Sequence, residues 1–192
     1  DDFCGEFLYE WVSEVYDRIS TDSLPESNAT DNLEKRISEF GLPKSDGDED
    51  SDFRPAVDGA EYELEPNDMG IKHFALEFCK DGGTFVYENK RGVKRIKFGM
   101  CRYERGTFPE TDYYSERVSV PSGREFDCVA AAEWVEKEKL LIRIYVIDDC
   151  MGNLFITLGF KGDDVGIEMN KRAEFFLDDY DGFACGHRMK RG

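Results

Sequence analysis

The sequence contains no long apolar run. A transmembrane helix needs about 20 consecutive, mostly apolar residues, and no stretch of this 192-residue chain comes near that length. The N-terminal residues also lack the order of basic and then apolar residues that marks a signal peptide. We therefore expect a soluble chain with no membrane partner.

Sequence signatures of the common catalytic folds are missing as well. The chain has no G-x-S-x-G nucleophile elbow, no G-x-x-x-x-G-K phosphate loop and no Rossmann glycine fingerprint. No serine is followed three positions later by a lysine that could take its proton. Of the two histidines, we interpret His73 as a surface or hydrogen-bonded residue, with a barrel mouth as the alternative, and His187 as part of a frayed C-terminus. We therefore predict no catalytic residue and no bound cofactor.

The sequence also predicts no metal site. Its cysteines stand singly, without a C-x-x-C pair or a histidine at zinc spacing, so we expect reduced, buried thiols, with disulfides as the alternative. Asp46, Asp48 and Asp50 resemble the start of a calcium loop. The sixth position of that loop is Ser51, where the sharp turn needs glycine, and the twelfth is Val57, where a bidentate glutamate belongs. The cysteines are Cys4, Cys79, Cys101, Cys128, Cys150 and Cys185.

Positive charge is scarce at the front of the chain. The formal net charge is −17, and residues 1–52 hold 16 acidic and 4 basic residues, which leaves only about −5 for the remainder. Phosphate binding needs clustered lysine and arginine, so we exclude nucleic acid as a partner. The acidity favours solubility as its explanation, and a basic partner recognised through residues 46–52 is the alternative.

Residues 1–43 have the pattern of two helices. The apolar residues of 2–19 recur at helical spacing, and a second helix is predicted over 30–40, closed by Gly41 and Pro43. An acidic segment, 44–58, follows as a predicted linker. We expect the aromatic face of the first helix to be covered either by the barrel or by a domain outside this sequence. This candidate docking face consists of Phe3, Phe7, Trp11 and Val15.

Residues 59–187 have the pattern of an antiparallel β-barrel, followed by a tail at 188–192. Its centre is a hairpin over 126–148, whose apolar residues alternate on both arms around a charged turn at 136–139. Short joints between strands favour a meander, and closing it into a lipocalin-like barrel removes the exposed edges. A two-sheet sandwich is the alternative. The predicted strands are 61–65, 71–79, 84–88, 93–101, 118–120, 127–135, 140–148, 154–160, 165–169 and 182–187.

Several packing and turn motifs of this region resemble a known family. They are residues 74–78, 81–84 and 89–92, Phe98 with Gly99, Tyr103, Gly106, Phe108 and Pro109, and residues 129–132 with Trp134. Together they are similar to the C-terminal accessory domain of bacterial serine hydrolases related to class C β-lactamases and penicillin-binding proteins. That family's catalytic serine, lysine and tyrosine lie in a preceding domain, and no position here matches them.

The resemblance implies a non-catalytic accessory domain of a cytoplasmic bacterial enzyme. Its partner would be the catalytic serine-hydrolase domain of the same polypeptide, and it would shape access to that domain's active site. The chain would then be the accessory module without its enzyme. The alternative function is that of a stand-alone lipocalin-like protein that binds a small molecule in the barrel interior. The apolar inward residues indicate an interior that is filled by side chains.

Overall fold

A computed structural model shows two compact units, Asp1–Leu42 and Pro43–Gly192. None of the helices among the described residues is long and apolar enough to cross a bilayer. The structure describes residues 12–19, 29–39, 41–110, 112–114, 119–121, 125–148, 151–173 and 175–190.

The first unit is helical where it is described. Residues 12–17 form a helix, and α2 spans Ala29–Glu39. Three of the four predicted docking residues, Phe3, Phe7 and Trp11, lie outside the described residues. The fourth, Val15, is 55% exposed. The second predicted helix is therefore confirmed, the first is confirmed over residues 12–17, and the docking face stays a prediction.

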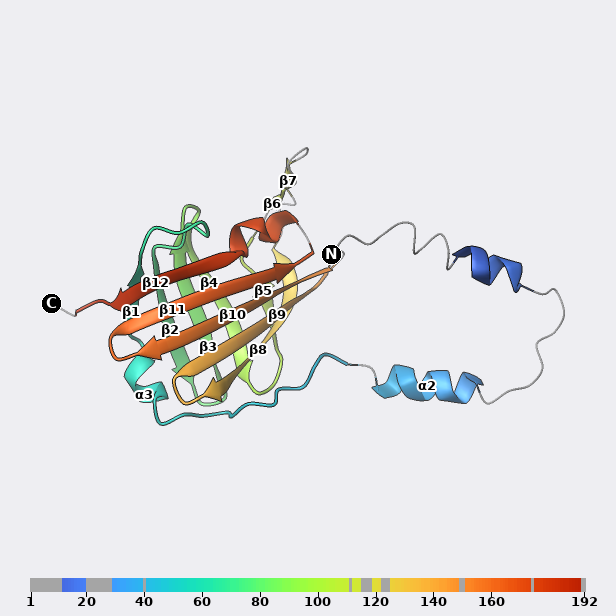
Figure 1. Ribbon diagram of the computed structural model, residues 1–192, viewed down its shortest axis with the longest axis horizontal. Coiled ribbons are helices and arrows are strands. Elements are labelled where there is room, and N and C mark those ends of the chain that lie inside the picture. Colours follow the sequence, from blue (N-terminus) through green and yellow to red (C-terminus); the bar gives the residue numbers. More distant parts are fainter. Residues whose placement is uncertain are drawn as a thin grey trace. The chain divides into compact units, whose positions relative to one another are not determined.

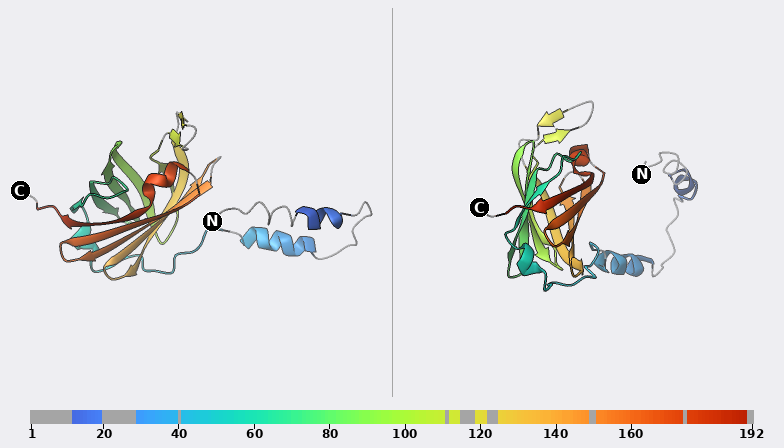
Figure 2. Two further views of the ribbon diagram at one scale, coloured as in Figure 1. Left: turned by 45° about the horizontal axis from the view of Figure 1, so that its top comes forward. Right: turned by 60° about the vertical axis from the view of Figure 1, so that its left-hand side comes forward.

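The second unit is a closed β-barrel, which confirms the predicted fold class over the sandwich (Figures 1 and 2). Over the described residues one sheet follows the order β4-β3-β2-β1-β12-β11-β10-β9-β8-β5. All these neighbours are antiparallel, and a short parallel pairing of β4 with β8, at Gly99 and Met100, closes the cylinder. The strands are β1 (Glu61–Leu64), β2 (His73–Cys79), β3 (Gly82–Asn89), β4 (Gly92–Met100), β5 (Glu104–Phe108), β8 (Phe126–Glu136), β9 (Lys139–Ile147), β10 (Met151–Lys161), β11 (Asp164–Arg172) and β12 (Gly182–Arg188).

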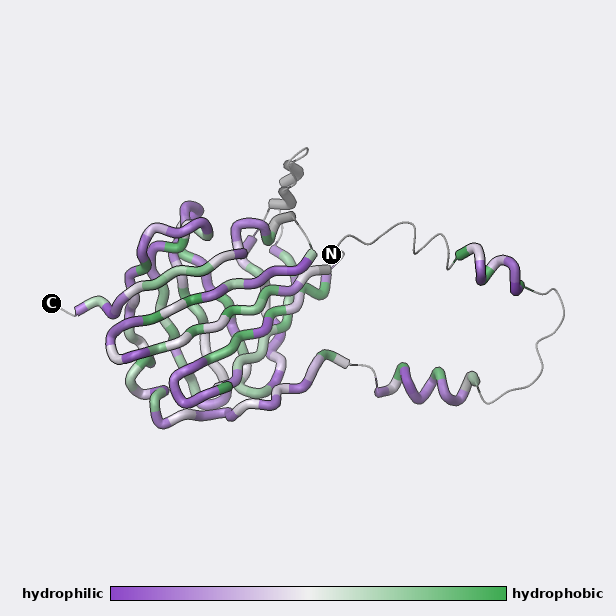
Figure 3. The backbone as a smooth tube through the Cα atoms, in the orientation of Figure 1, coloured by the Kyte–Doolittle hydropathy of each residue, from purple (hydrophilic) through white to green (hydrophobic). Residues whose placement is uncertain are grey.

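The central hairpin of β8 and β9 shows why this sequence forms a barrel. On β9 every second side chain is buried, from Leu140 to Val146, and the residues between them face outward. Hydropathy alternates in the same way along the strands in Figure 3. On β8 the small side chains of Ala130 and Ala132 leave room for the second layer of the core, and Trp134 is 2% exposed. The alternation predicted for this hairpin is confirmed.

One barrel strand lies in a segment where the sequence predicted a joint. No strand was predicted between residues 101 and 118, yet β5 begins at Glu104 and pairs with β8. The strand was missed because only Phe108 among its five residues is a large apolar side chain. Between β4 and β5 the sheet has no ladder, and the ion pair Lys97–Glu104 (2.7 Å) spans this gap. A separate two-stranded sheet pairs β6 (Asp112–Tyr114) with β7 (Ser119–Pro121).

The acidic segment 44–58 is attached to the barrel, contrary to the solvated linker that we expected. Asp48 and Trp134 exchange two backbone hydrogen bonds of 2.9 Å. A short helix, α3 (Arg54–Val57), follows, and Val57 is fully buried in the core. Composition did not predict this attachment, because backbone groups make most of the contacts. A 3₁₀ helix, η1 (Phe175–Tyr180), which precedes β12, was also not predicted.

Candidate functional site

Aromatic side chains fill the barrel interior. A column of buried rings runs through it, with centroid distances of 5.1 Å (Tyr62–Phe74), 5.7 Å (Phe74–Phe85), 5.1 Å (Phe85–Tyr87), 6.1 Å (Tyr87–Tyr180) and 5.4 Å (Phe108–Tyr180). Ring pairs at these separations pack in direct contact. The interior along this column is therefore packed core.

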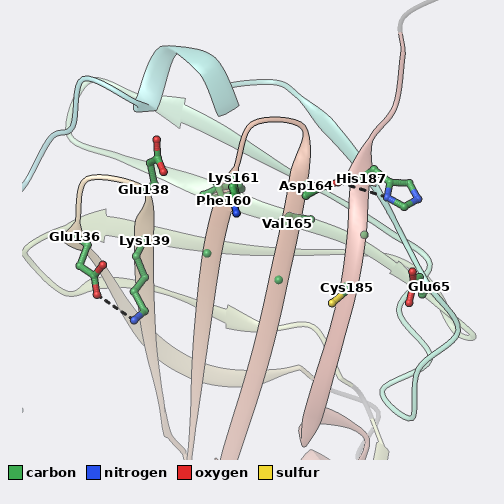
Figure 4. A pocket seen from close by; sticks show the side chains of 13 residues that line it. Glu65, Glu136, Glu138, Lys139, Phe160, Lys161, Asp164, Val165, Cys185 and His187 are labelled. Atoms are coloured by element: carbon green, nitrogen blue, oxygen red, sulfur yellow. Dashed lines mark hydrogen bonds and ion pairs between the residues drawn. The ribbon is translucent and has the colours of Figure 1, made fainter.

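A groove of about 650 Å³ crosses the outer face of β9, β10, β11 and β12 (Figure 4). Glu136 and Lys139 stand on one side of it, and Cys185 and Glu65 stand on the other, with β10 and β11 between them. The lining residues are Glu65, Glu136, Glu138, Lys139, Gly159, Phe160, Lys161, Asp164, Val165, Gly166, Cys185, Gly186 and His187.

Two glycines on neighbouring strands form the floor of this groove. Gly159 of β10 lies opposite Gly166 of β11, and the same row continues to Lys139 on one side and Cys185 on the other. Neither glycine has a positive φ. A Cβ atom at Gly159 would meet nothing within 4 Å, and one at Gly166 would lie 3.4 Å from the ring of Phe183. The fold therefore does not require glycine at either position.

The rim of the groove carries charges of both signs. Lys139 pairs with Glu136 at 3.2 Å, and the Nδ1 atom of His187 lies 3.9 Å from a carboxylate oxygen of Asp164 (Figure 4). Beside the floor, the ring of Phe183 is 62% exposed. A flat molecule lying on the two glycines would thus meet peptide planes below it and an aromatic ring at its edge.

A second polar site lies at one end of the aromatic column. The carboxylate of Glu110, which is 2% exposed, accepts hydrogen bonds from Arg91 (2.7 Å) and from the hydroxyl of Tyr180 (2.5 Å). The hydroxyls of Tyr180 and Tyr87 are 2.8 Å apart. Burial raises the pKa of both tyrosines above its usual value near 10, so both remain phenols and donors. A charged acceptor and its donors are therefore enclosed in the core.

Both histidines lie in strands on the outer face. His73 on β2 lies opposite Glu63 and Glu88, and His187 on β12 lies opposite Glu63 and Asp164. The expectation of a frayed C-terminus was wrong for His187, because β12 extends through it and pairs on both sides. His73, which we expected to be a surface or hydrogen-bonded residue, is half-buried on this face. Neither one faces the interior.

The remaining site predictions have mixed outcomes. Within the part of the chain that the structure describes, no group of three potential ligands is arranged to hold a metal ion. The thiols of Cys79, Cys101, Cys128 and Cys185 are free, and Cys4 and Cys150 lie outside the described residues. Of the four free thiols only that of Cys128 is fully buried, so the expectation of buried cysteines was wrong for Cys79 and Cys185, which are exposed.

Sequence reasoning did not identify the groove floor or the buried carboxylate. A glycine inside a predicted strand can mark a close approach by a ligand or another backbone. Gly159 and Gly166 each lay inside a predicted strand and carried that signal. Glu110 and Tyr180 carried none, because they are 70 positions apart and their pairing depends on the barrel's closure.

No protein-family model matches this chain, and no curated protein sequence is significantly similar to it. A fatty acid-binding protein from Drosophila melanogaster brain has a similar structure, with 9% identity and a TM-score of 0.43, over 69% of this chain and 99% of that one. A fatty-acid-binding protein from Manduca sexta has 12% identity and a TM-score of 0.39, over 70% and 99%. The resemblance to serine-hydrolase accessory domains finds no support in these comparisons.

Proposed function

We propose that this chain is a non-catalytic binding protein that holds a small molecule in the outer groove. The observation that carries the proposal is the glycine floor formed by Gly159 and Gly166. Glycine inside a strand costs roughly 0.5–1 kcal/mol relative to alanine. The fold gains nothing in return at these two positions, because a Cβ atom would fit at both. A ligand that must approach the backbone explains the cost.

The size and composition of the groove fit such a ligand. Small-molecule sites have volumes of about 300–1,000 Å³ and combine apolar surface with a few polar groups, and this groove has about 650 Å³. Lys161, His187 and Glu138 supply polar groups around the glycine floor. The interior site that we considered from sequence is less suitable, since the ring column occupies it.

Dye titration tests the proposal directly. We would titrate the full chain with three flat fluorescent dyes of different charge: 8-anilinonaphthalene-1-sulfonate, Nile red and thioflavin T. Saturable binding of at least one dye at one site per chain is expected. Gly159→Val should abolish it while preserving the fold, because its side chain would fill the floor. Thr157→Val, two residues earlier on the same face, is the matched control and should bind as the wild type does.

Cysteine alkylation locates the bound dye without relying on fluorescence. Cys185 lines the groove and Cys79 lies outside it, and both thiols are exposed. A dye in the groove should slow iodoacetamide labelling of Cys185 and leave that of Cys79 unchanged. Equal protection of both cysteines, or dye binding that survives Gly159→Val, would contradict the proposal.

The accessory role predicted from the family resemblance is a second candidate. It is favoured by the apolar side chains that the first unit leaves exposed, among them Ile19 (64%), Leu33 (57%) and Ile37 (64%). Both candidates require that this chain does not turn over nitrocefin or p-nitrophenyl esters. Hydrolysis above the rate in buffer would reject both. Measured binding to a class C-related catalytic domain, lost on Ile37→Asp, would favour the accessory role over the groove.

A further inference from the structure

The buried carboxylate of Glu110 lies in a cage of hydrogen-bond donors. Arg91 of the β3–β4 turn and Tyr180 of η1 bind its two oxygens separately, Arg91 at Oε2 and Tyr180 at Oε1. The Nζ atom of Lys94 lies 3.9 Å from Oε2 and donates a hydrogen bond of 2.7 Å to the carbonyl of Pro109. Donors from three separate elements therefore converge on one carboxylate.

The hydrogens in this cage can be assigned. Tyr180 has a single hydroxyl hydrogen, which it donates to Glu110, so the hydrogen between Tyr87 and Tyr180 must come from Tyr87. Arg91 donates a second bond, of 3.1 Å, to Asp179, which in turn pairs with Lys90 at 3.0 Å. The donors are thus oriented toward the acceptor by contacts of their own. They form a receptor whose geometry does not depend on Glu110 alone.

Stability alone does not explain this arrangement. A buried ion pair is often no better for stability than well-packed apolar residues of the same volume. Farther along the column the chain uses apolar rings, such as Phe74 and Phe85. At this end it buries instead two phenols, a guanidinium contact and a carboxylate. Arginine with planar, paired donors is the residue of choice for carboxylate recognition.

We propose that Arg91, Tyr180 and Tyr87 form a carboxylate-binding site in the barrel, which the chain's own Glu110 occupies. An external monocarboxylate can take the place of the Glu110 side chain. Because the Phe108 ring packs against that of Tyr180 at 5.4 Å, the site has room only for a carboxylate about as small as the Glu110 side-chain atoms that it replaces. This inference does not rest on the outer groove.

The test removes the internal carboxylate and supplies an external one. Glu110→Ala should lower the melting temperature in sodium chloride. Sodium formate or acetate at the same ionic strength should then raise it saturably, by several degrees, whereas sodium benzoate, which is larger than the side-chain atoms removed, should not. The wild-type chain should show no such rise at these concentrations, since its own carboxylate fills the site at high effective concentration.

Three further variants separate binding from general salt effects. Adding Arg91→Met to Glu110→Ala should abolish the response to carboxylates. Gly159→Val in the same background should leave the response intact, because the groove is a different site. Glu110→Gln keeps the side-chain shape and should respond to no carboxylate. Equal stabilisation of the wild type and Glu110→Ala would show a solvent effect and overturn the inference.

A Glu110→Ala variant that folds poorly would still test the inference. If that variant is unfolded in chloride and folds in formate or acetate, the external anion has replaced the lost carboxylate, as proposed. If neither Glu110→Ala nor the smaller Glu110→Gly variant folds in any carboxylate, the donors act only as structural partners of Glu110, and the inference is rejected.

Discussion

The backbone N–H of Gly47 donates a hydrogen bond of 2.8 Å to Oε2 of Glu133, a side chain 86 positions away. The other oxygen of that carboxylate pairs with Arg143 at 2.5 Å, and Glu133 is 1% exposed. A Cβ atom at Gly47 would lie 2.6 Å from the carbonyl oxygen of Trp134. Glycine is therefore needed for this close approach, which attaches the acidic segment to the outside of β8.

Replacing Glu133 tests this attachment. Glu133→Ala removes the acceptor of Gly47 and leaves Arg143 partly buried without its ion-pair partner, so the free energy of unfolding should fall by about 3 kcal/mol. Glu133→Gln keeps an acceptor oxygen and should cost less, on the order of 1–2 kcal/mol. Urea unfolding of the three proteins measures both values. Unchanged stability of Glu133→Ala would show that the acidic segment is not held by this residue.

The strand glycines differ in how they respond to an added methyl group. At Gly82 a Cβ atom would lie 2.2 Å from the carbonyl oxygen of Phe98, and backbone atoms cannot move away cheaply. Gly82→Ala should therefore destabilise the barrel by roughly 3 kcal/mol or more. Gly159→Ala meets open space and should stabilise it by about 0.5–1 kcal/mol. The two melting temperatures, measured side by side, should shift in opposite directions, and a loss at Gly159 would mean that the fold does need this glycine.

The buried tyrosines predict a loss of stability at alkaline pH. Burial raises the pKa of Tyr180 and Tyr87 above the value near 10 that they have in the unfolded chain. The stability that each tyrosine adds to the folded state is complete below pH 10. It is lost as the pH rises above 10, because only the unfolded state then releases the proton. The free energy of unfolding should fall by up to about 1.4 kcal/mol per pH unit for each tyrosine.

Tyr180→Phe isolates this effect from other groups that titrate in the same range. The variant should be less stable than the wild type at pH 8, because Glu110 loses a donor. The difference between the two proteins in unfolding free energy should shrink as the pH rises from 10 to 11. Urea midpoints at half-unit steps measure the difference, and a gap that stays constant across this range would contradict a raised pKa for Tyr180.

The cysteines should react with thiol reagents at different rates. Burial raises the pKa of Cys128 to about 12, so its thiol is both enclosed and protonated. Cys79 and Cys185 are exposed. Peptide mapping after brief treatment with a thiol reagent at pH 8 should find these two labelled and Cys128 unlabelled until urea is added. Rapid labelling of Cys128 in the folded chain would contradict its burial.

The sequence was sufficient to predict those parts of the fold in which buried and exposed side chains alternate. The β8–β9 hairpin was predicted because large aliphatic residues recur at every second position from Leu140 to Val146, after a charged turn. The strand β5 was missed because it has a single apolar anchor, Phe108. The attachment at Gly47 was missed because its backbone bonds leave no compositional signal.

The two sites depend on register, which a sequence does not reveal. Gly159 and Gly166 flank a short turn, yet only the pairing of β10 with β11 places them side by side as a floor. Glu110 and Tyr180 meet only when the cylinder closes, and each by itself resembles an ordinary loop residue. Local pattern therefore predicted the barrel, and long-range pairing determined its candidate sites.

Chemical-shift mapping locates a bound dye on the barrel residue by residue and so distinguishes the outer groove from the interior. The ¹⁵N-labelled chain would be titrated with the dye that binds best, and amide shifts would be followed residue by residue. The largest shifts should cluster at Gly159, Gly166 and Cys185 and should disappear in Gly159→Val. Shifts concentrated instead on inward residues such as Ile142 and Leu158, or spread evenly over the barrel, would contradict binding in the outer groove.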